Sequence, residues 1–323
     1  MKNETIMNRI KKLVALLLAF GVVQLLVSVG VLNDYIMATV STIGINIILA
    51  VSLNLITGFT GQFSLGHAGF MSIGAYTCAI ITLRNPTTPG FVAGVFAGAL
   101  MAALVGFVVG LPTLRLRGDY LAIATLGMSE IIRIIFLNLD ITNGAAGLSN
   151  IPEFTNWMWL FIFTSGTVLI ITNFINSSHG RACISIREDE IAADAMGINS
   201  TRYKVTAFVI GAFFAGIAGA LYASRFYVLK PDAFGFLKSI DILVIVVLGG
   251  LGSISGSIIA AILLAIITSY LQSFPEIRMV IYSITLIVIM LFRPQGLMGS
   301  KELSISMFKK WSSLLNRKDG GVA

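Results

Sequence analysis

The chain has 323 residues, of which 56% are hydrophobic, 11% are charged and 32 are glycine. Soluble domains carry about 25% charged residues and need a polar surface, so this composition excludes a soluble globular protein. Continuous apolar runs of about 20 residues, rather than short alternating segments, favour spanning helices over a β-barrel. We therefore expect an all-α polytopic membrane protein. The net charge of +7 comes from loops and tails, where it indicates membrane topology rather than a nucleic-acid partner.

The apolar runs predict the membrane segments in chain order. Residues 13–32 follow a basic start and lack a small-residue cleavage site, so we interpret them as an uncleaved span. The run 239–271 is too long for one span and is interrupted by GGLGSISG at 249–256, which predicts a glycine-broken helical hairpin or two short helices. With a last span at 279–292, about ten transmembrane segments result. The other expected spans are 36–56, 67–83, 90–110, 119–138, 156–175 and 205–225.

Two of these spans carry small residues at every fourth position. Gly90, Gly94 and Gly98 begin such a series in one span, and Gly211 and Gly219 belong to another. Small residues at this spacing let helix backbones approach each other closely. We interpret both series as packing surfaces.

Threading the spans with the N-terminus inside places most of the 22 lysines and arginines on one side. The positive-inside rule then puts both termini in the cytoplasm. We expect a basic cytoplasmic tail at 1–12, a transmembrane domain at 13–300 that contains the cytoplasmic loop 177–204, and a second basic cytoplasmic tail at 301–323.

No enzyme or cofactor site is recognisable in the sequence. A GxxxxGK[ST] phosphate loop is absent, and no loop is long enough to fold as a nucleotide-binding domain. With two histidines and two distant cysteines, the chain offers no metal-ligand spacing. We expect no catalysis and no bound cofactor or metal, so ATP would have to be used by partner subunits.

The loop 177–204 contains a run of charges followed by a small apolar helix. Arg187, Glu188, Asp189 and Glu190 form the run, and the helix continues to Gly197, a natural C-cap. A short amphipathic helix in a membrane loop is typical of a docking element. It is equally typical of a helix lying passively on lipid headgroups.

A polar, glycine-rich stretch separates the second and third spans. Asn54 is followed by GFTGQFSLGHAGF, which carries Gln62, Ser64 and His67. Backbone freed by a glycine break within a membrane is tolerated against protein or a watery cavity, so these residues are candidates for a translocation path. The alternatives are a tight cytoplasmic turn and, for His67, simple packing. The spacing of Gly58, Gly61 and Ser64 recurs at 249–255, a weak sign of an internal repeat.

Glu130 and Arg133 lie within the fifth expected span. An ionised group at mid-bilayer costs about 2.5–3.5 kcal/mol on insertion scales, so we expect the two to face the bundle and pair across one helical turn. The pair could be structural, or Glu130 could line a path. In an ion-coupled secondary transporter, the alternative of a different class, the two would couple transport to an ion.

Several segments together resemble a known family. They are GQFSLGHAGFMSIGAYT (61–77), RLRGDYLAIATLGMSEIIRIIFLN (115–138), TNGAAGLSNIP (142–152), REDEIAADAMGINSTRYK (187–204), SIDILVIVVLGGLGSISG (239–256) and RPQGL (293–297). In this order they resemble the permease subunits of branched-chain amino acid ABC importers, and the GQxSLGHA and RGDYLA segments resemble the M-type subunit.

The resemblance implies partners, a membrane and a substrate. These are a homologous H-type permease in a heterodimer, two cytoplasmic ATPase subunits and an extracytoplasmic protein that binds leucine, isoleucine or valine. The membrane would be the cytoplasmic (inner) membrane of a bacterium or archaeon. Permeases of urea and short-amide ABC importers have similar motifs and are the alternative.

The resemblance also implies a coupling role for the loop 177–204. Importer permeases commonly carry an EAA-x-x-x-G coupling motif, in which Ala192, Ala193 and Gly197 match. Glu190 comes one position early, with Ile191 in the place of the acidic residue. The coupling residues that the resemblance implies are Arg187, Glu188, Asp189, Glu190, Ala192, Ala193 and Gly197.

Overall fold

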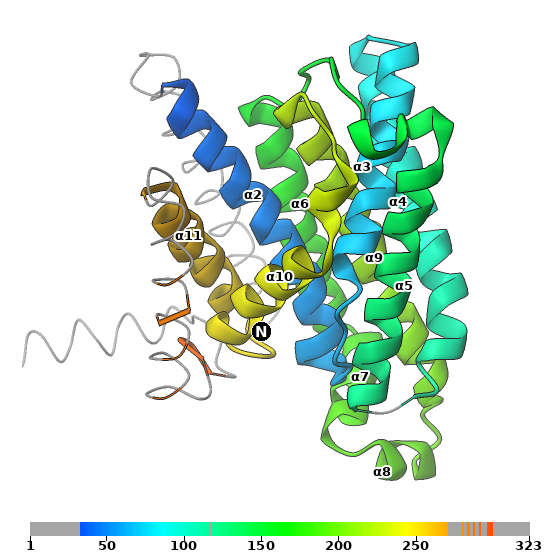
Figure 1. Ribbon diagram of the computed structural model, residues 1–323. Helices are drawn as coiled ribbons and strands as arrows, with labels where there is room; N and C mark the ends of the chain where they lie inside the picture. The colour runs from blue at the N-terminus through cyan, green and yellow to red at the C-terminus, as the bar shows by residue number, and fades with distance from the viewer. Residues whose placement is uncertain are drawn as a thin grey trace, which may run out of the picture.

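The computed structural model describes residues 33–116 and 118–270, together with isolated positions between 280 and 299. The expected span 13–32, most of the span 279–292 and both tails therefore lie outside the described residues. The described part is helical, with one isolated β-bridge between Leu148 and Leu229 (Figure 1). The all-α prediction is confirmed for this part of the chain.

Between residues 33 and 270, leaving out residue 117, the structure has ten α-helices joined by connections of different lengths, the longest of them at 139–156. In the part of the chain that the structure describes, five segments are long and apolar enough to cross a membrane, namely α2 with the turn that follows it, α4, α5, α6 and α9. The count of about ten spans and the membrane hairpin remain predictions. The helices are α2 (Asp34–Asn54), α3 (His67–Arg84), α4 (Thr88–Thr113), α5 (Asp119–Asn138), α6 (Trp157–Ile175), α7 (Ser178–Glu188), α8 (Glu190–Ala195), α9 (Ser200–Phe226), α10 (Phe236–Gly249) and α11 (Ile254–Tyr270).

Side-chain caps set where several helices begin. The Thr87 side chain accepts a hydrogen bond from the Gly90 N–H, and α4 therefore starts two residues before the apolar run. The Asn199 side chain accepts from the Arg202 N–H, and α9 begins at Ser200 rather than at the expected residue 205. Hydropathy marks where a helix becomes apolar, whereas the cap marks where it begins.

Glycines let α3, α4 and α9 pack backbone against backbone. A Cβ atom added at Gly74 would lie 2.5 Å from Gly216 Cα, and one added at Gly98 would lie 2.7 Å from Gly74 O. At Gly219, an added Cβ would lie 2.9 Å from Ala75 N. Any side chain at these positions would separate the helices. The glycine series predicted from spacing are therefore close-packing surfaces.

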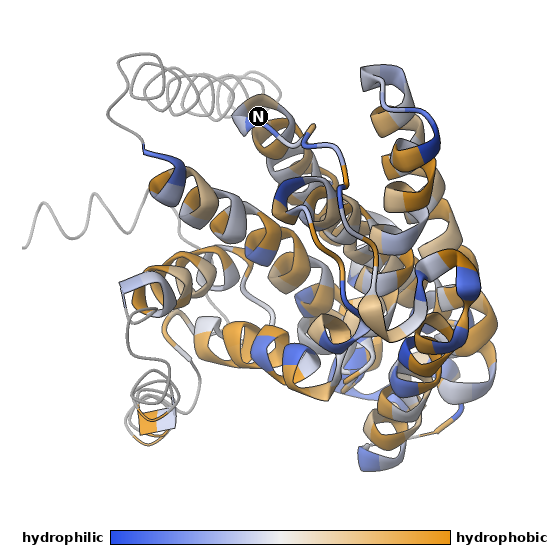
Figure 2. Ribbon diagram, turned by 45° about the horizontal axis from the view of Figure 1, so that its top comes forward, coloured by the Kyte–Doolittle hydropathy of each residue, from blue (hydrophilic) through white to orange (hydrophobic). Residues whose placement is uncertain are grey.

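The outer faces of the helices are apolar. Figure 2 shows hydrophobic residues along most of each helix and hydrophilic residues mainly at helix ends and connections. Leu104 and Val108 on α4 are 58% and 60% exposed, and Ile123 on α5 is 67% exposed. Exposed apolar surface on this scale suits lipid or a neighbouring membrane subunit and would be a liability in water.

Candidate functional site

The end of α2 departs from α-helical geometry. A π-helical turn, η1 (Leu55–Phe59), follows α2, and residues 61–66 continue without regular structure to the start of α3. Such turns disturb the usual pairing of backbone carbonyls. The Gly58 carbonyl accepts a hydrogen bond from the guanidinium of Arg187 on α7, with 2.7 Å between N and O. The first break is thus tied to the loop that contains α7.

Asn54 joins this break to a second one between α10 and α11. Its amide nitrogen donates to Ser253 O at 2.9 Å and to Ser257 Oγ at 2.8 Å. The Gly252 N–H donates to Asn54 Oδ1 at 2.9 Å. Asn54 is fully buried. The two segments whose glycine spacing is similar therefore lie side by side, held by a buried side chain.

The other predicted path residues differ in how they are bonded. His67 Nε2 lies 2.8 Å from Ser52 Oγ, and His67 is 1% exposed, so it packs α3 against α2. Ser64 Oγ accepts a hydrogen bond from the Gly66 N–H. Gln62 is 3% exposed, and neither its amide nitrogen nor its amide oxygen has a hydrogen-bond partner among the described residues. Each buried polar group without a hydrogen-bond partner lowers folding stability by about 1–3 kcal/mol. Gln62 carries two such groups within the described part of the chain and is therefore the most destabilising of the predicted path residues.

The start of α3 lies between α5 and α10. The Leu65 N–H donates to Thr125 Oγ1 on α5 at 3.1 Å, and the Ala68 N–H donates to Ser239 Oγ on α10 at 3.3 Å. The Ser239 hydroxyl satisfies one of the backbone donors that a helix start leaves unpaired, and the Thr125 hydroxyl satisfies a backbone donor just before that start. The segment 61–66 is therefore tied to the helix bundle at its end next to α3, while Gly61 and Phe63 are exposed.

Glu130 and Arg133 on α5 form a cluster with the connection before α10. Arg133 Nε lies 2.7 Å from Glu130 Oε2, and a second guanidinium nitrogen lies 3.1 Å from Asp232 Oδ1. The Phe236 N–H donates to Glu130 Oε1 at 3.0 Å. Glu130 thus accepts a hydrogen bond from the positive N-terminal end of α10. The Glu130 and Arg133 side chains are 27% and 25% exposed, and that of Asp232 is 82% exposed.

The charged run before α8 is used within the chain. Asp189 is the N-cap of α8, accepting from the N–H groups of Ile191 and Ala192 at 2.9 and 3.0 Å. Glu190 Oε1 lies 2.7 Å from Lys204 Nζ on α9. The local fold thus accounts for these two carboxylates. The exposed Glu188 lies 3.7 Å from Arg187 Nε and is the freer acidic group.

The residues of the implied coupling motif differ in exposure: Ala192 and Gly197 are exposed and Ala193 is buried. Ala193 is 4% exposed and faces its own chain, while Ile191 and Met196 are 73% and 83% exposed. Gly197 has φ +84° and provides the left-handed turn after α8. Ala193 therefore packs against its own chain, and the surface open to a partner includes Ala192 and Gly197 together with the large apolar side chains of Ile191 and Met196.

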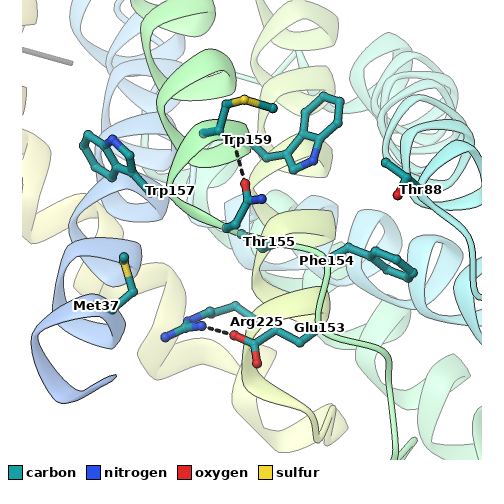
Figure 3. A pocket seen from close by; sticks show the side chains of 10 residues that line it. Met37, Thr88, Glu153, Phe154, Thr155, Trp157, Trp159 and Arg225 are labelled. Atoms are coloured by element: carbon teal, nitrogen blue, oxygen red, sulfur yellow. Dashed lines mark hydrogen bonds and ion pairs between the residues drawn. The ribbon is translucent and has the colours of Figure 1, made fainter. Parts of the chain in front are cut away.

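A separate cavity of about 840 Å³ lies where α2, α4 and α6 begin and α9 ends (Figure 3). Arg225 forms an ion pair with Glu153 beside it, and Trp157 and Trp159 contribute aromatic walls. None of the predicted path or coupling residues lines this cavity. α6 runs from this region towards α7, so the cavity lies at the opposite end of the bundle from α8.

No group of three or more His, Cys, Asp or Glu side chains could hold a metal ion within the described ranges. The polar groups of the site make hydrogen bonds between helices at points where those helices are interrupted. Such an arrangement can hold one conformation and release it for another.

Comparisons with known proteins agree with one another. Residues 35–290 match the family described as branched-chain amino acid transport system / permease component. The chain is 39% identical over 289 residues to the high-affinity branched-chain amino acid transport system permease protein LivM of Escherichia coli, covering 79% of this chain and 68% of the relative. It is 28% identical over 291 residues to the corresponding LivH of Salmonella typhimurium, covering 79% and 92%.

An archaeal relative is also similar. The probable branched-chain amino acid transport permease protein LivM of Methanocaldococcus jannaschii is 24% identical over 324 residues, with 83% of this chain and 94% of the relative covered. No solved structure matches the chain.

Proposed function

Because this chain belongs to the branched-chain amino acid transport permease family, we propose that it is the M-type permease subunit of an ATP-driven importer for leucine, isoleucine and valine. The 39% identity to LivM over 79% of the chain carries this proposal. Weaker similarity to LivH supports pairing with a second, homologous permease. The complex would also contain two cytoplasmic ATPase subunits and an extracytoplasmic binding protein.

Reconstitution tests this proposal. The chain would be co-expressed with a homologous permease, ATPase subunits and a binding protein from the same genome, and placed in proteoliposomes. We expect leucine uptake that requires both ATP and the binding protein. Uptake of urea or a short amide in place of leucine would assign the chain to a related importer instead.

The proposed mechanism divides energy supply from transport. The chain itself would hold no cofactor, because its sequence carries no phosphate-binding loop, and the partner subunits would bind and hydrolyse ATP. Movement of the ATPase pair would reach the permease through residues 187–199. The polar segment from Asn54 to His67 would form part of the path that opens and closes.

We also propose about ten spans, with α10 and α11 as a glycine-broken hairpin and with both termini cytoplasmic. The distribution of lysine and arginine supports this topology. Cys183, in the loop 177–204, is a poor reporter of it. The thiol is fully buried, and burial raises its pKa to about 11, so little reactive thiolate forms at neutral pH.

An introduced cysteine should report the topology instead. Ser185 lies on α7 and is exposed, as is Thr88 at the start of α4, on the opposite side in this topology. In intact cells, a membrane-impermeant thiol reagent should label Thr88→Cys and should reach Ser185→Cys after the membrane is opened. Labelling of Ser185→Cys from outside would invert the topology.

The alternative of an ion-coupled secondary transporter rests on Glu130 and Arg133. Glu130→Gln removes the charge that faces Arg133 but retains an oxygen for the Phe236 N–H, so we expect a loss of about 1–2 kcal/mol in folding stability. Folded yield should fall while ATP-dependent uptake per folded molecule survives. Uptake by the whole complex in proteoliposomes should also be insensitive to an imposed pH gradient.

Opposite results would favour the secondary transporter. Glutamine cannot release a proton, so a proton-carrying Glu130 would make the variant well folded but inactive. Together with gradient-driven uptake by the wild-type chain without any ATPase, that result would overturn the ABC assignment.

A further inference from the structure

The two interrupted helices meet at one place, which we name the break junction. It consists of the π-helical turn 55–59 after α2 and the turn 250–253 between α10 and α11, joined by the buried side chain of Asn54. Gly252 has φ +84°, a conformation that side chains other than that of glycine rarely adopt. Interrupted helices have fewer internal hydrogen bonds than continuous ones, so the junction is the natural place for these helices to change direction.

Arg187 fits into this junction from the cytoplasmic loop. One guanidinium nitrogen donates to Gly58 O at 2.7 Å, and a Cβ atom added at Gly252 would lie 2.5 Å from the same nitrogen. A Cβ atom added at Gly61 would lie 3.3 Å from Arg187 Cγ. The arginine side chain thus touches both breaks and fills space that only glycines leave open.

The hydrogen bond from Arg187 to Gly58 O is charge-assisted and therefore strong. A guanidinium donating to a carbonyl is charge-assisted and roughly twice as strong as a bond between neutral groups. The Arg187 side chain is 32% exposed, so water screens it in part. The neighbouring Glu188 carboxylate lies 3.7 Å from Arg187 Nε, whereas the bond to Gly58 O is made by a different guanidinium nitrogen. The acidic neighbour therefore leaves the contact with Gly58 in place.

We propose that Arg187 is a positioning residue that links α8 mechanically to the break junction, so that displacement of the docking helix is passed to the ends of α2, α10 and α11. Arg187 lies in the last turn of α7, and Asp189, two residues later, caps α8. Arg187 therefore acts on its own chain and has no need to touch the ATPase. This inference rests on the proposed function.

The first experiment compares two arginines of α7. Arg181 is exposed and bonds to Asn176 O and Ser178 Oγ, close to its own helix start, so Arg181→Ala is the matched control. In the reconstituted complex, Arg187→Ala should keep ATPase association and ATP hydrolysis within about twofold. Its leucine uptake should fall about tenfold or more, as expected for one lost charge-assisted hydrogen bond. The number of ATP molecules hydrolysed per leucine should rise accordingly.

A covalent bond should replace the lost contact. The Cβ position at Gly61 lies 3.6 Å from Arg187 Cβ, within the usual range of about 3.5–4.5 Å for a disulfide. The double variant Gly61→Cys, Arg187→Cys should be uncoupled when reduced and should regain uptake on oxidation. Gly61→Cys alone is the control, because Gly61 has φ +70° and any side chain there is strained.

Two results would overturn the inference. If Arg187→Ala releases the ATPase, Arg187 is a docking residue, and if the oxidised double variant stays uncoupled, no rigid link exists at this place. Failure of the proposed function looks different, because the wild-type complex itself would then show no ATP-driven leucine uptake. If the wild-type complex imports urea instead of leucine, the number of ATP molecules hydrolysed per urea molecule tests the role of Arg187 in the same way.

Discussion

Aspartate at both Ile191 and Met196 should abolish ATP-driven uptake while leaving the permease folded in the membrane. These side chains are 73% and 83% exposed on α8, so their replacement disturbs no internal packing. Burying an apolar side chain of this size in a partner groove contributes about 1.5–3 kcal/mol, and two charges would remove both contributions. We expect ATPase association to weaken by about 100-fold or more, measured by co-purification with the tagged permease.

Ser185→Asp provides the matched control, because it adds a charge to an exposed position on α7 in the same loop. It should transport normally. Ala193→Trp should lose uptake by a different route. Ala193 is 4% exposed, so a tryptophan there would displace α8 from its own chain rather than alter the surface open to a partner. If the double aspartate variant transports as well as Ser185→Asp, α8 is a passive interfacial helix.

Leucine at Gln62 should make the protein more stable and less active. The amide is buried without a hydrogen-bond partner among the described residues, so removing it should stabilise the folded state by about 1–3 kcal/mol. Uptake should nevertheless fall about tenfold if the amide finds its partner in another state of the transport cycle. The midpoint of thermal unfolding in detergent and leucine uptake measure the two effects.

Thr57→Val is the control for stability, since the Thr57 hydroxyl is also buried without a partner within the described ranges. It should raise the unfolding midpoint in the same way. Normal uptake by Gln62→Leu would contradict a role in the path and leave residues 61–66 as a structural connection.

Hydropathy and glycine spacing predicted the positions of several described helices well, because both patterns lie within a single helix. Apolar runs place α4, α5 and α6 within a few residues, and the four-residue glycine spacing identifies the packing faces of α4 and α9. Helix ends are less predictable, because a single side chain such as Asn199 can extend a helix beyond its apolar stretch. The π-helical turn at 55–59 has no periodic signal in the sequence.

The candidate site depends on contacts that no local pattern encodes. Asn54 and Gly252 are 198 residues apart in sequence, and the similarity of their surroundings indicates a possible repeat but no contact. Arg187 appears in the sequence as one member of a charged run, and its bond to Gly58 follows from the packing of α7 below the break. The orientation of α8 likewise depends on its packing against α7 and α9, with Ala193 buried and Ile191 and Met196 outside.

The glycine contacts among α3, α4 and α9 also limit which motions the permease can make. At Gly74 and Gly216 the neighbouring backbones leave no room for a Cβ atom, so sliding one helix past another by one residue would drive side chains into a main chain. Shear between packed helices needs side chains that can repack as the surfaces slide, and at these glycines the contact is with a neighbouring backbone, which cannot repack. The three helices would therefore stay fixed relative to one another. The interrupted helices around them would move as the permease alternates between two access states.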